Sequence, residues 1–173
     1  MTKSLQTKTT QWAENYQHKM IHPKDLSDRA TFFRNQNKKI VTLNGSFDLL
    51  HAGHLHILYE ASLQGDLLIV ALNSDASIKK YKSNSRPIIP LEYRLQMMAA
   101  LAFVDYVTWF EETDPRTILQ QIRPHVHVNG TEYGENCIEA DTVLSCGGKM
   151  HIVSIVPGLS TSKIIEKIRH LCD

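Results

Sequence analysis

The sequence is poor in cysteine, and its three cysteines do not form a disulfide framework. Cys137, Cys146 and Cys172 have no CxxC spacing, and an odd number cannot pair completely. We therefore expect reduced thiols, and none of them sits in a recognisable nucleophile context. No apolar run approaches the roughly 20 residues that span a bilayer. The polar N-terminus also lacks the apolar core of a signal peptide. These absences predict a cytoplasmic protein without a membrane partner.

Charge is balanced overall but unevenly distributed along the chain. There are 19 Lys and Arg against 18 Asp and Glu, and residues 1–39 hold eight of the basic residues and only three of the acidic ones. This segment has no dense basic run and no motif of a nucleic-acid module, so we expect a solvated leader and no nucleic-acid partner. The length of 173 residues, with 42% apolar and 21% charged residues, is typical of one globular domain.

Short apolar runs alternate with helical segments along most of the chain. Buried strands are predicted at 39–43, 66–72, 104–110, 125–128 and 150–155. Helices are predicted at 52–64, 74–80, 91–102, 113–123, 139–146 and 160–170. This order predicts an α/β fold, a Rossmann-like, doubly wound parallel five-stranded sheet. Leader helices at 12–18 and 23–37 divide the chain into residues 1–38 and an α/β domain at 39–173.

The segment NGSFDLLHAGH joins the first predicted strand to its helix. Ligands of doubly wound folds bind beyond the carboxyl ends of the strands, so this connection predicts a nucleotide site. His51 and His54 are three residues apart on one face of a helix entrance, where free N–H groups attract phosphate. Glycine lets a ligand approach the backbone. The residues expected to line the nucleotide are Asn44, Gly45, Ser46, Phe47 and Gly53.

Other interpretations of the histidines remain open at this stage. His51 and His54 could bind a metal with His56 as a third ligand, but no Glu or Cys completes the set, so we predict no metal site. They could also be solvated structural residues. Asp48 is either a simple turn residue or a catalytic one that orients a histidine or the acceptor.

NGSFDLLHAGH resembles the signature of the cytidylyltransferase-like nucleotidyltransferases. The likeness continues through LIVALNSDASIKKYKS, RPIIPLEYRLQMMAAL, FVDYV, IRPHVHVNGTEY and GLSTSKIIEKI, which cover roughly residues 20 to 168. These segments are similar to the adenylyltransferase half of bifunctional heptose-phosphate kinase/adenylyltransferases, which make ADP-heptose for lipopolysaccharide. The resemblance implies that a sugar 1-phosphate, such as D-glycero-β-D-manno-heptose 1-phosphate, attacks the α-phosphorus of ATP and expels pyrophosphate.

The resemblance also implies roles for other residues. His51 and His54 would contact the triphosphate, Mg²⁺ would bridge phosphate oxygens, and the GLSTSK motif would supply a second phosphate-binding helix entrance. That entrance comprises Ser160, Thr161 and Ser162. Substrate contacts are expected from Asn73, Asp75, Lys82, Arg86 and Arg94, and nucleotide contacts from Asn129 and Gly130. From position alone, Asn73 and Asp75 could equally be turn and cap, and Arg94 could form a salt bridge.

This chain departs from the heptose enzymes at two places. It has Ser46 where they usually carry Cys, and Asn129-Gly130-Thr131-Glu132-Tyr133 where they tend to have Lys-Gly-Gly-Asp-Tyr. The missing lysine leaves the choice between ATP and CTP, and the acceptor, open. No kinase half fits in 173 residues, so a separate enzyme would supply the sugar 1-phosphate.

The phosphate motifs also fit two other functions, and the apolar leader residues could form a dimer. A cytidylyltransferase that uses CTP and glycerol 3-phosphate shares the HxGH and late Ser/Thr motifs, and a nucleotide-binding sensor without turnover has the same phosphate motifs. Apolar residues of the leader could form a homodimer interface or pack on their own domain. These residues are Trp12, Tyr16, Phe32 and Phe33.

Overall fold

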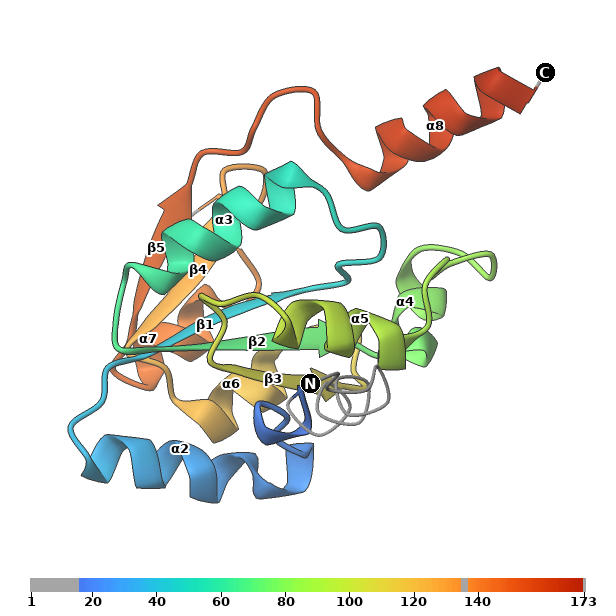
Figure 1. The fold of residues 1–173 in the computed structure, drawn as a ribbon. Coiled ribbons are helices and arrows are strands. Elements are labelled where there is room, and N and C mark those ends of the chain that lie inside the picture. The colour runs from blue at the N-terminus through green and yellow to red at the C-terminus, as the bar shows by residue number, and fades with distance from the viewer. Residues whose placement is uncertain (1–15, 135–136, 173) are drawn as a thin grey trace, which may run out of the picture.

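A five-stranded parallel sheet forms the centre of the fold (Figure 1). The computed structural model describes residues 16–134 and 137–172. The strands are β1 (Ile40–Gly45), β2 (Leu67–Asn73), β3 (Tyr106–Phe110), β4 (Val126–Gly130) and β5 (Lys149–Val153). Their order is β3-β2-β1-β4-β5, and every neighbouring pair is parallel. This confirms the Rossmann-like fold predicted from the sequence.

Helices cover both faces of the sheet, because each central strand is apolar on both sides. In β2, Val70 and Leu72 belong to one core cluster, while Ile69 and Ala71 belong to a second one. The first cluster includes residues of α3 (Ala52–Ser62) and α5 (Leu91–Ala99). The second includes residues of α2 (Leu26–Asn35), α6 (Arg116–Ile122) and α7 (Ala140–Ser145). The two sets of helices therefore lie on opposite faces of the sheet (Figure 1).

Local side-chain contacts set some of the boundaries. The short helix α4 (Asp75–Tyr81) begins where Ser74 Oγ accepts the N–H of Ser77 at 3.1 Å, as its N-cap. The edge strand β3 begins two residues later than predicted. There the N–H of Asp105 donates to the carbonyl of Leu68 at 3.2 Å, but Asp105 Oδ2 accepts the N–H of Leu68 at 2.8 Å, so a carboxylate takes the place of a backbone acceptor. α5 ends at Ala99, three residues before its predicted end.

The leader packs onto the sheet as part of the second core. Leu26, Ala30 and Phe33 of α2, which follows a short 3-10 turn η1 (Pro23–Asp25), are buried in the second core cluster. Lys19 Nζ donates to the carbonyls of Leu101 and Val104 at 3.0 and 2.7 Å, which ties the segment before η1 to the segment before β3. Phe32 remains half exposed and Trp12 lies outside the described residues.

The last helix, α8 (Thr161–Cys172), extends away from the body of the fold (Figure 1). Ile168 and Leu171 on this helix are exposed. Among the helices of the described segments, none has the length and apolar character needed to cross a membrane.

Candidate active site

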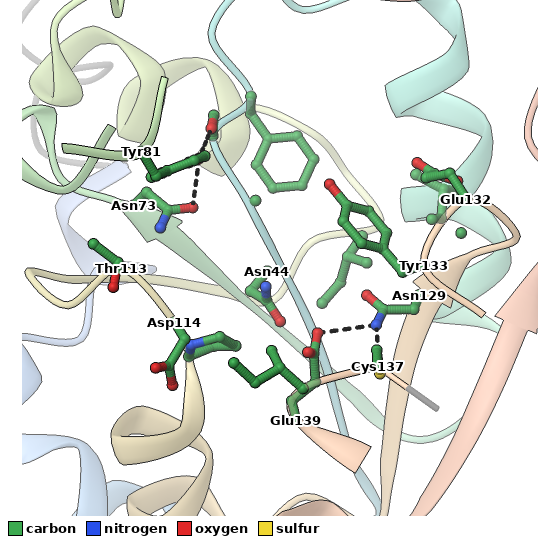
Figure 2. A pocket seen from close by; sticks show the side chains of 18 of the residues that line it. Asn44, Asn73, Tyr81, Thr113, Asp114, Asn129, Glu132, Tyr133, Cys137 and Glu139 are labelled. Atoms are coloured by element: carbon green, nitrogen blue, oxygen red, sulfur yellow. Dashed lines mark hydrogen bonds between the residues drawn. The ribbon is translucent and has the colours of Figure 1, made fainter. Parts of the chain in front are cut away.

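A cavity of about 530 Å³ opens at the carboxyl ends of β1, β2 and β4 (Figure 2). It is lined by many of the residues that the sequence singled out, namely Asn44, Gly45, Ser46, Phe47, Asp48, His54, Asn73, Lys82, Asn129, Gly130 and Thr161. It is also lined by residues that sequence reasoning missed, among them Tyr81, Thr113, Asp114, Glu132, Tyr133, Cys137 and Glu139. Most of these residues follow the ends of strands. Their position could have identified them from the sequence, because ligands of such sheets bind at the carboxyl ends of the strands.

The turn between β1 and α3 is shaped by Phe47. Its φ of 46° lies in the left-handed region, which non-glycine residues rarely adopt. The ring is buried and lies edge-on to His54, with 5.2 Å between ring centroids. A Cβ on Gly45 would come within 3.1 Å of the Phe47 ring, so glycine there leaves room for this turn. The turn thereby places His54 at the cavity wall.

The two histidines stack at the N-terminus of α3. Their ring centroids are 3.8 Å apart at an interplanar angle of 18°. His51 is the N-cap of the helix, and its Nδ1 accepts the N–H of His54 at 3.3 Å. Burial, with the nearby charges of His51 and Lys82, lowers the pKa of His54 to about 4, and burial also lowers the pKa of His51. His54 is therefore neutral at pH 7, so one ring nitrogen donates a hydrogen bond and the other accepts one.

Lys82 lines the cavity near His54. Burial and the charge of Arg86 lower the pKa of Lys82. Neighbouring Tyr81 also lines the cavity, and its hydroxyl lies 2.5 Å from Ser46 Oγ. These contacts join the end of α4 to the turn after β1, so both walls of the cavity near the histidines are held together.

Asp48 anchors the loop of residues 82–90. Its side chain is fully buried, and it accepts hydrogen bonds from Arg86 Nε at 2.5 Å and from the N–H groups of Ile88 and Ile89 at 2.8 and 2.9 Å. Burial opposes ionisation, but these donors outweigh it and lower the pKa of Asp48. In this structure the Asp48 carboxylate binds this loop, and the catalytic role expected of Asp48 stays a prediction. Arg86 Nη2 is buried without a hydrogen-bond partner within the described segments.

Arg94 joins four segments around the cavity. The side chain is 0% exposed, and its guanidinium donates to the carbonyls of Ile89, Ser46 and Asn73 and to Asp75 Oδ1. These bonds span 2.6 to 2.9 Å. In this structure the buried guanidinium positions its neighbours, and the substrate contact expected of Arg94 stays a prediction. Asp75 is its ion-pair partner, and Asn73 lines the cavity from the end of β2.

The segment before α8 approaches the histidines. A Cβ on Gly53 would lie 3.1 Å from the His51 ring and 3.5 Å from Leu159 Cβ. Thr161 lines the cavity together with His54, whereas Ser160 Oγ accepts the N–H of Lys163 at 3.2 Å as a helix cap. Ser162 is exposed. The two helix N-termini predicted to bind phosphate, those of α3 and α8, are therefore close together where Gly53 approaches Leu159.

The placement of possible metal-ligating side chains bears on whether the protein alone could bind a metal ion. Across residues 16–134 and 137–172, no group of three or more His, Cys, Asp or Glu side chains is placed to hold a metal ion. Near the N-terminus of α3, the cavity offers nitrogen donors from His54 and Lys82. The Asp48 carboxylate already accepts three hydrogen bonds from the loop of residues 82–90. The part of the cavity near His54 and Lys82 is therefore suited to anionic oxygens.

Comparison with known proteins agrees with this geometry. A family model described as cytidylyltransferase-like matches residues 42–167. The chain is 40% identical over 158 residues to the bifunctional protein HldE of Marinomonas sp. (strain MWYL1), covering 91% of this chain and 33% of that protein. It is 46% identical over 135 residues to the bifunctional protein HldE of Azotobacter vinelandii, covering 78% and 28%. The chain thus spans about a third of the length of these relatives.

A solved structure shares the fold. The lipopolysaccharide core biosynthesis protein from Thermoplasma volcanium GSS1 superposes with a TM-score of 0.55 at 28% sequence identity, covering 69% of this chain and 97% of that one. The matched family region contains β2 to β5, most of β1, the histidine pair and the entrance to α8. The chain therefore belongs to the cytidylyltransferase-like family.

Proposed function

We propose that this protein is a nucleotidyltransferase that transfers AMP from ATP to a sugar phosphate and releases pyrophosphate. The observation that carries the proposal is the stacked His51–His54 pair at the N-terminus of α3, where His54 shares a cavity with Lys82 and Thr161. The favoured acceptor is D-glycero-β-D-manno-heptose 1-phosphate. This choice rests on the similarity to the HldE proteins and on a structural relative described as a lipopolysaccharide core biosynthesis protein.

The reaction would proceed by direct displacement. A phosphate oxygen of the acceptor forms a bond to the α-phosphorus of ATP, the bond from that phosphorus to the bridging oxygen breaks, and pyrophosphate leaves. No side chain needs to form a covalent intermediate, so the protein's task is to position the reactants and stabilise negative charge. His51 and His54 would donate N–H groups to phosphate oxygens, and Lys82 would contribute positive charge.

Mg²⁺ would be held mainly by the phosphates of the substrate. The described cavity residues provide nitrogen and amide donors near the histidines, which suit phosphate oxygens, and no carboxylate cage for a cation. Mg²⁺ keeps several waters and binds through substrate phosphates in many nucleotide enzymes. When bound, it would neutralise charge on the triphosphate.

The acceptor would lie beside the ends of β2 and β3. Asn73, Thr113 and Asp114 line the cavity there and offer both hydrogen-bond donors and acceptors to a polyol. A cytidylyltransferase that uses CTP and glycerol 3-phosphate remains the second candidate, because the same phosphate end would serve it. A non-catalytic nucleotide sensor is the candidate of a different class.

The test is pyrophosphate release by the purified protein with Mg²⁺, each nucleoside triphosphate and each acceptor. ATP with heptose 1-phosphate is expected to give the highest rate. Turnover only with CTP and glycerol 3-phosphate would replace the substrate assignment. Nucleotide binding without pyrophosphate release from any acceptor would support the sensor.

His54 provides the mechanistic control. His54→Ala should lower kcat by on the order of 10², the usual effect of removing one donor to a developing oxyanion. His56, on the same helix, does not line the cavity among the described residues, so His56→Ala should leave kcat near the wild-type value. Equal rates for His54→Ala and the wild type would contradict the role given to His54.

A further inference from the structure

A buried polar network forms one wall of the cavity. Glu139 is 5% exposed and lines the cavity, and its Oε1 accepts a hydrogen bond from Asn129 Nδ2 at 2.9 Å (Figure 2). His127 Nε2 lies 3.6 Å from the same oxygen, while His127 Nδ1 is 2.7 Å from Thr42 Oγ1. His127 is 0% exposed. The network fixes the Glu139 carboxylate from two sides.

Glu139 and His54 reach the cavity from opposite layers of the fold. Glu139 precedes α7, which packs on one face of the sheet, and His54 belongs to α3, which packs on the other. A carboxylate in a partly dehydrated site repels phosphate. A triphosphate bound near His54 and Lys82 would therefore leave Glu139 beside the nucleoside end.

The Glu139 wall presents hydrogen-bond acceptors. Burial would raise the pKa of Glu139, but the nearby His127 ring and the bond from Asn129 outweigh burial and lower the pKa to about 2, so the carboxylate is ionised and can only accept. Asn44, which follows the last residue of β1 that pairs with β4, also lines the cavity. Its Oδ1 is buried with no hydrogen-bond partner in the described part of the chain. A buried acceptor of this kind is costly unless a ligand completes it.

Resting on the proposed function, we propose that Glu139 is a specificity-determining residue that accepts a hydrogen bond from the exocyclic amino group of the nucleobase. Asn129 and His127 are positioning residues that hold the carboxylate for this contact. Adenine and cytosine carry the amino donor. Hypoxanthine and uracil place a carbonyl oxygen at the same position, where it would meet an acceptor without a hydrogen between them.

The experiment compares substrates that differ in this group and in the hydrogen on the adjacent ring nitrogen. Rates of pyrophosphate release, and Kd values from nucleotide titration, are measured for ATP against ITP and for CTP against UTP. With the wild type, kcat/KM for the amino nucleotide of at least one pair should exceed that of its oxo counterpart by about 100-fold, because a site built around a hydrogen bond leaves polar groups unpaired with the wrong substrate. Glu139→Gln should narrow that ratio to below about 10-fold.

A matched control separates this contact from net charge. Glu132 lines the same cavity but is exposed, so Glu132→Gln removes an equal charge and should leave the ratio unchanged. Asn129→Ala should narrow the ratio as Glu139→Gln does, whereas purely structural damage would lower both rates together.

Each outcome bears on one claim. If the wild-type protein prefers neither ATP over ITP nor CTP over UTP, the inference is overturned. This result needs no variant, so it holds even if Glu139→Gln fails to fold. Equal narrowing by Glu132→Gln overturns it too, because charge alone would then explain the preference. Failure to bind any nucleoside triphosphate contradicts the proposed function itself.

Discussion

Replacing Asp48 should both destabilise the fold and release the loop beside the histidines. The carboxylate is fully buried and accepts three hydrogen bonds from the loop of residues 82–90, one of them from Arg86. Asp48→Asn keeps the shape of the side chain, but its NH₂ group then faces either the Arg86 donor or the two backbone N–H groups, so two donors meet without an acceptor. Breaking a buried ion pair costs about 3–5 kcal/mol, because the remaining charge stays uncompensated. Asn retains one acceptor, so we expect a loss of about 3 kcal/mol.

The chain contains a matched control for this substitution. Asp114 pairs with Arg116 at 2.9 Å, but the two side chains are 28% and 51% exposed. Exposed pairs contribute little to stability, so Asp114→Asn should leave the urea midpoint unchanged within error. Urea unfolding measures both variants, and pyrophosphate release should show that Asp48→Asn also lowers kcat/KM by at least about tenfold through misplaced Lys82. Equal midpoints for the two variants would refute the anchoring role.

The remaining predictions concern protonation and the arginine that joins the cavity walls. The pKa of His54 is lowered from 6.5 to about 4, so the unfolded chain binds this proton at a higher pH than the folded protein does, and stability should fall as pH drops from 6.5 through 4. An NMR titration should show the His54 ring titrating near 4 without ligand and higher with ATP bound; a midpoint near 6.5 without ligand would be inconsistent with its burial. Arg94→Lys keeps the charge but not the fork of four bonds. It should lower the melting temperature and raise the KM for ATP, and a wild-type KM would contradict the positioning role.

The fold could be predicted from the sequence because its signals are local. Runs such as residues 67–73 are apolar on both faces, which only a sheet covered on both sides can accommodate, and the structure confirms all five strands. Boundaries were less accurate where a distant contact decides them. β3 begins late because the Asp105 side chain bonds Leu68, 37 residues earlier in the chain.

The site could be predicted only where its chemistry lies within one short segment. His51 and His54 share a helix entrance, so their spacing was informative. The partner of Asp48 is 38 residues away, and Arg94 reaches four segments at once, so their roles depend on how the loops close over the sheet. Glu139 was missed for the same reason, because nothing near it in the sequence indicates that His127 and Asn129 hold it in the cavity.

The most direct test of nucleotidyl transfer follows the phosphates of ATP separately. The protein is incubated with Mg²⁺, heptose 1-phosphate and ATP labelled either at the α- or at the γ-phosphate, and the products are separated. Direct displacement predicts that α-label appears in the sugar nucleotide and γ-label appears only in pyrophosphate. Transfer of γ-label to the sugar, or release of γ-label as inorganic phosphate, would contradict the proposed reaction.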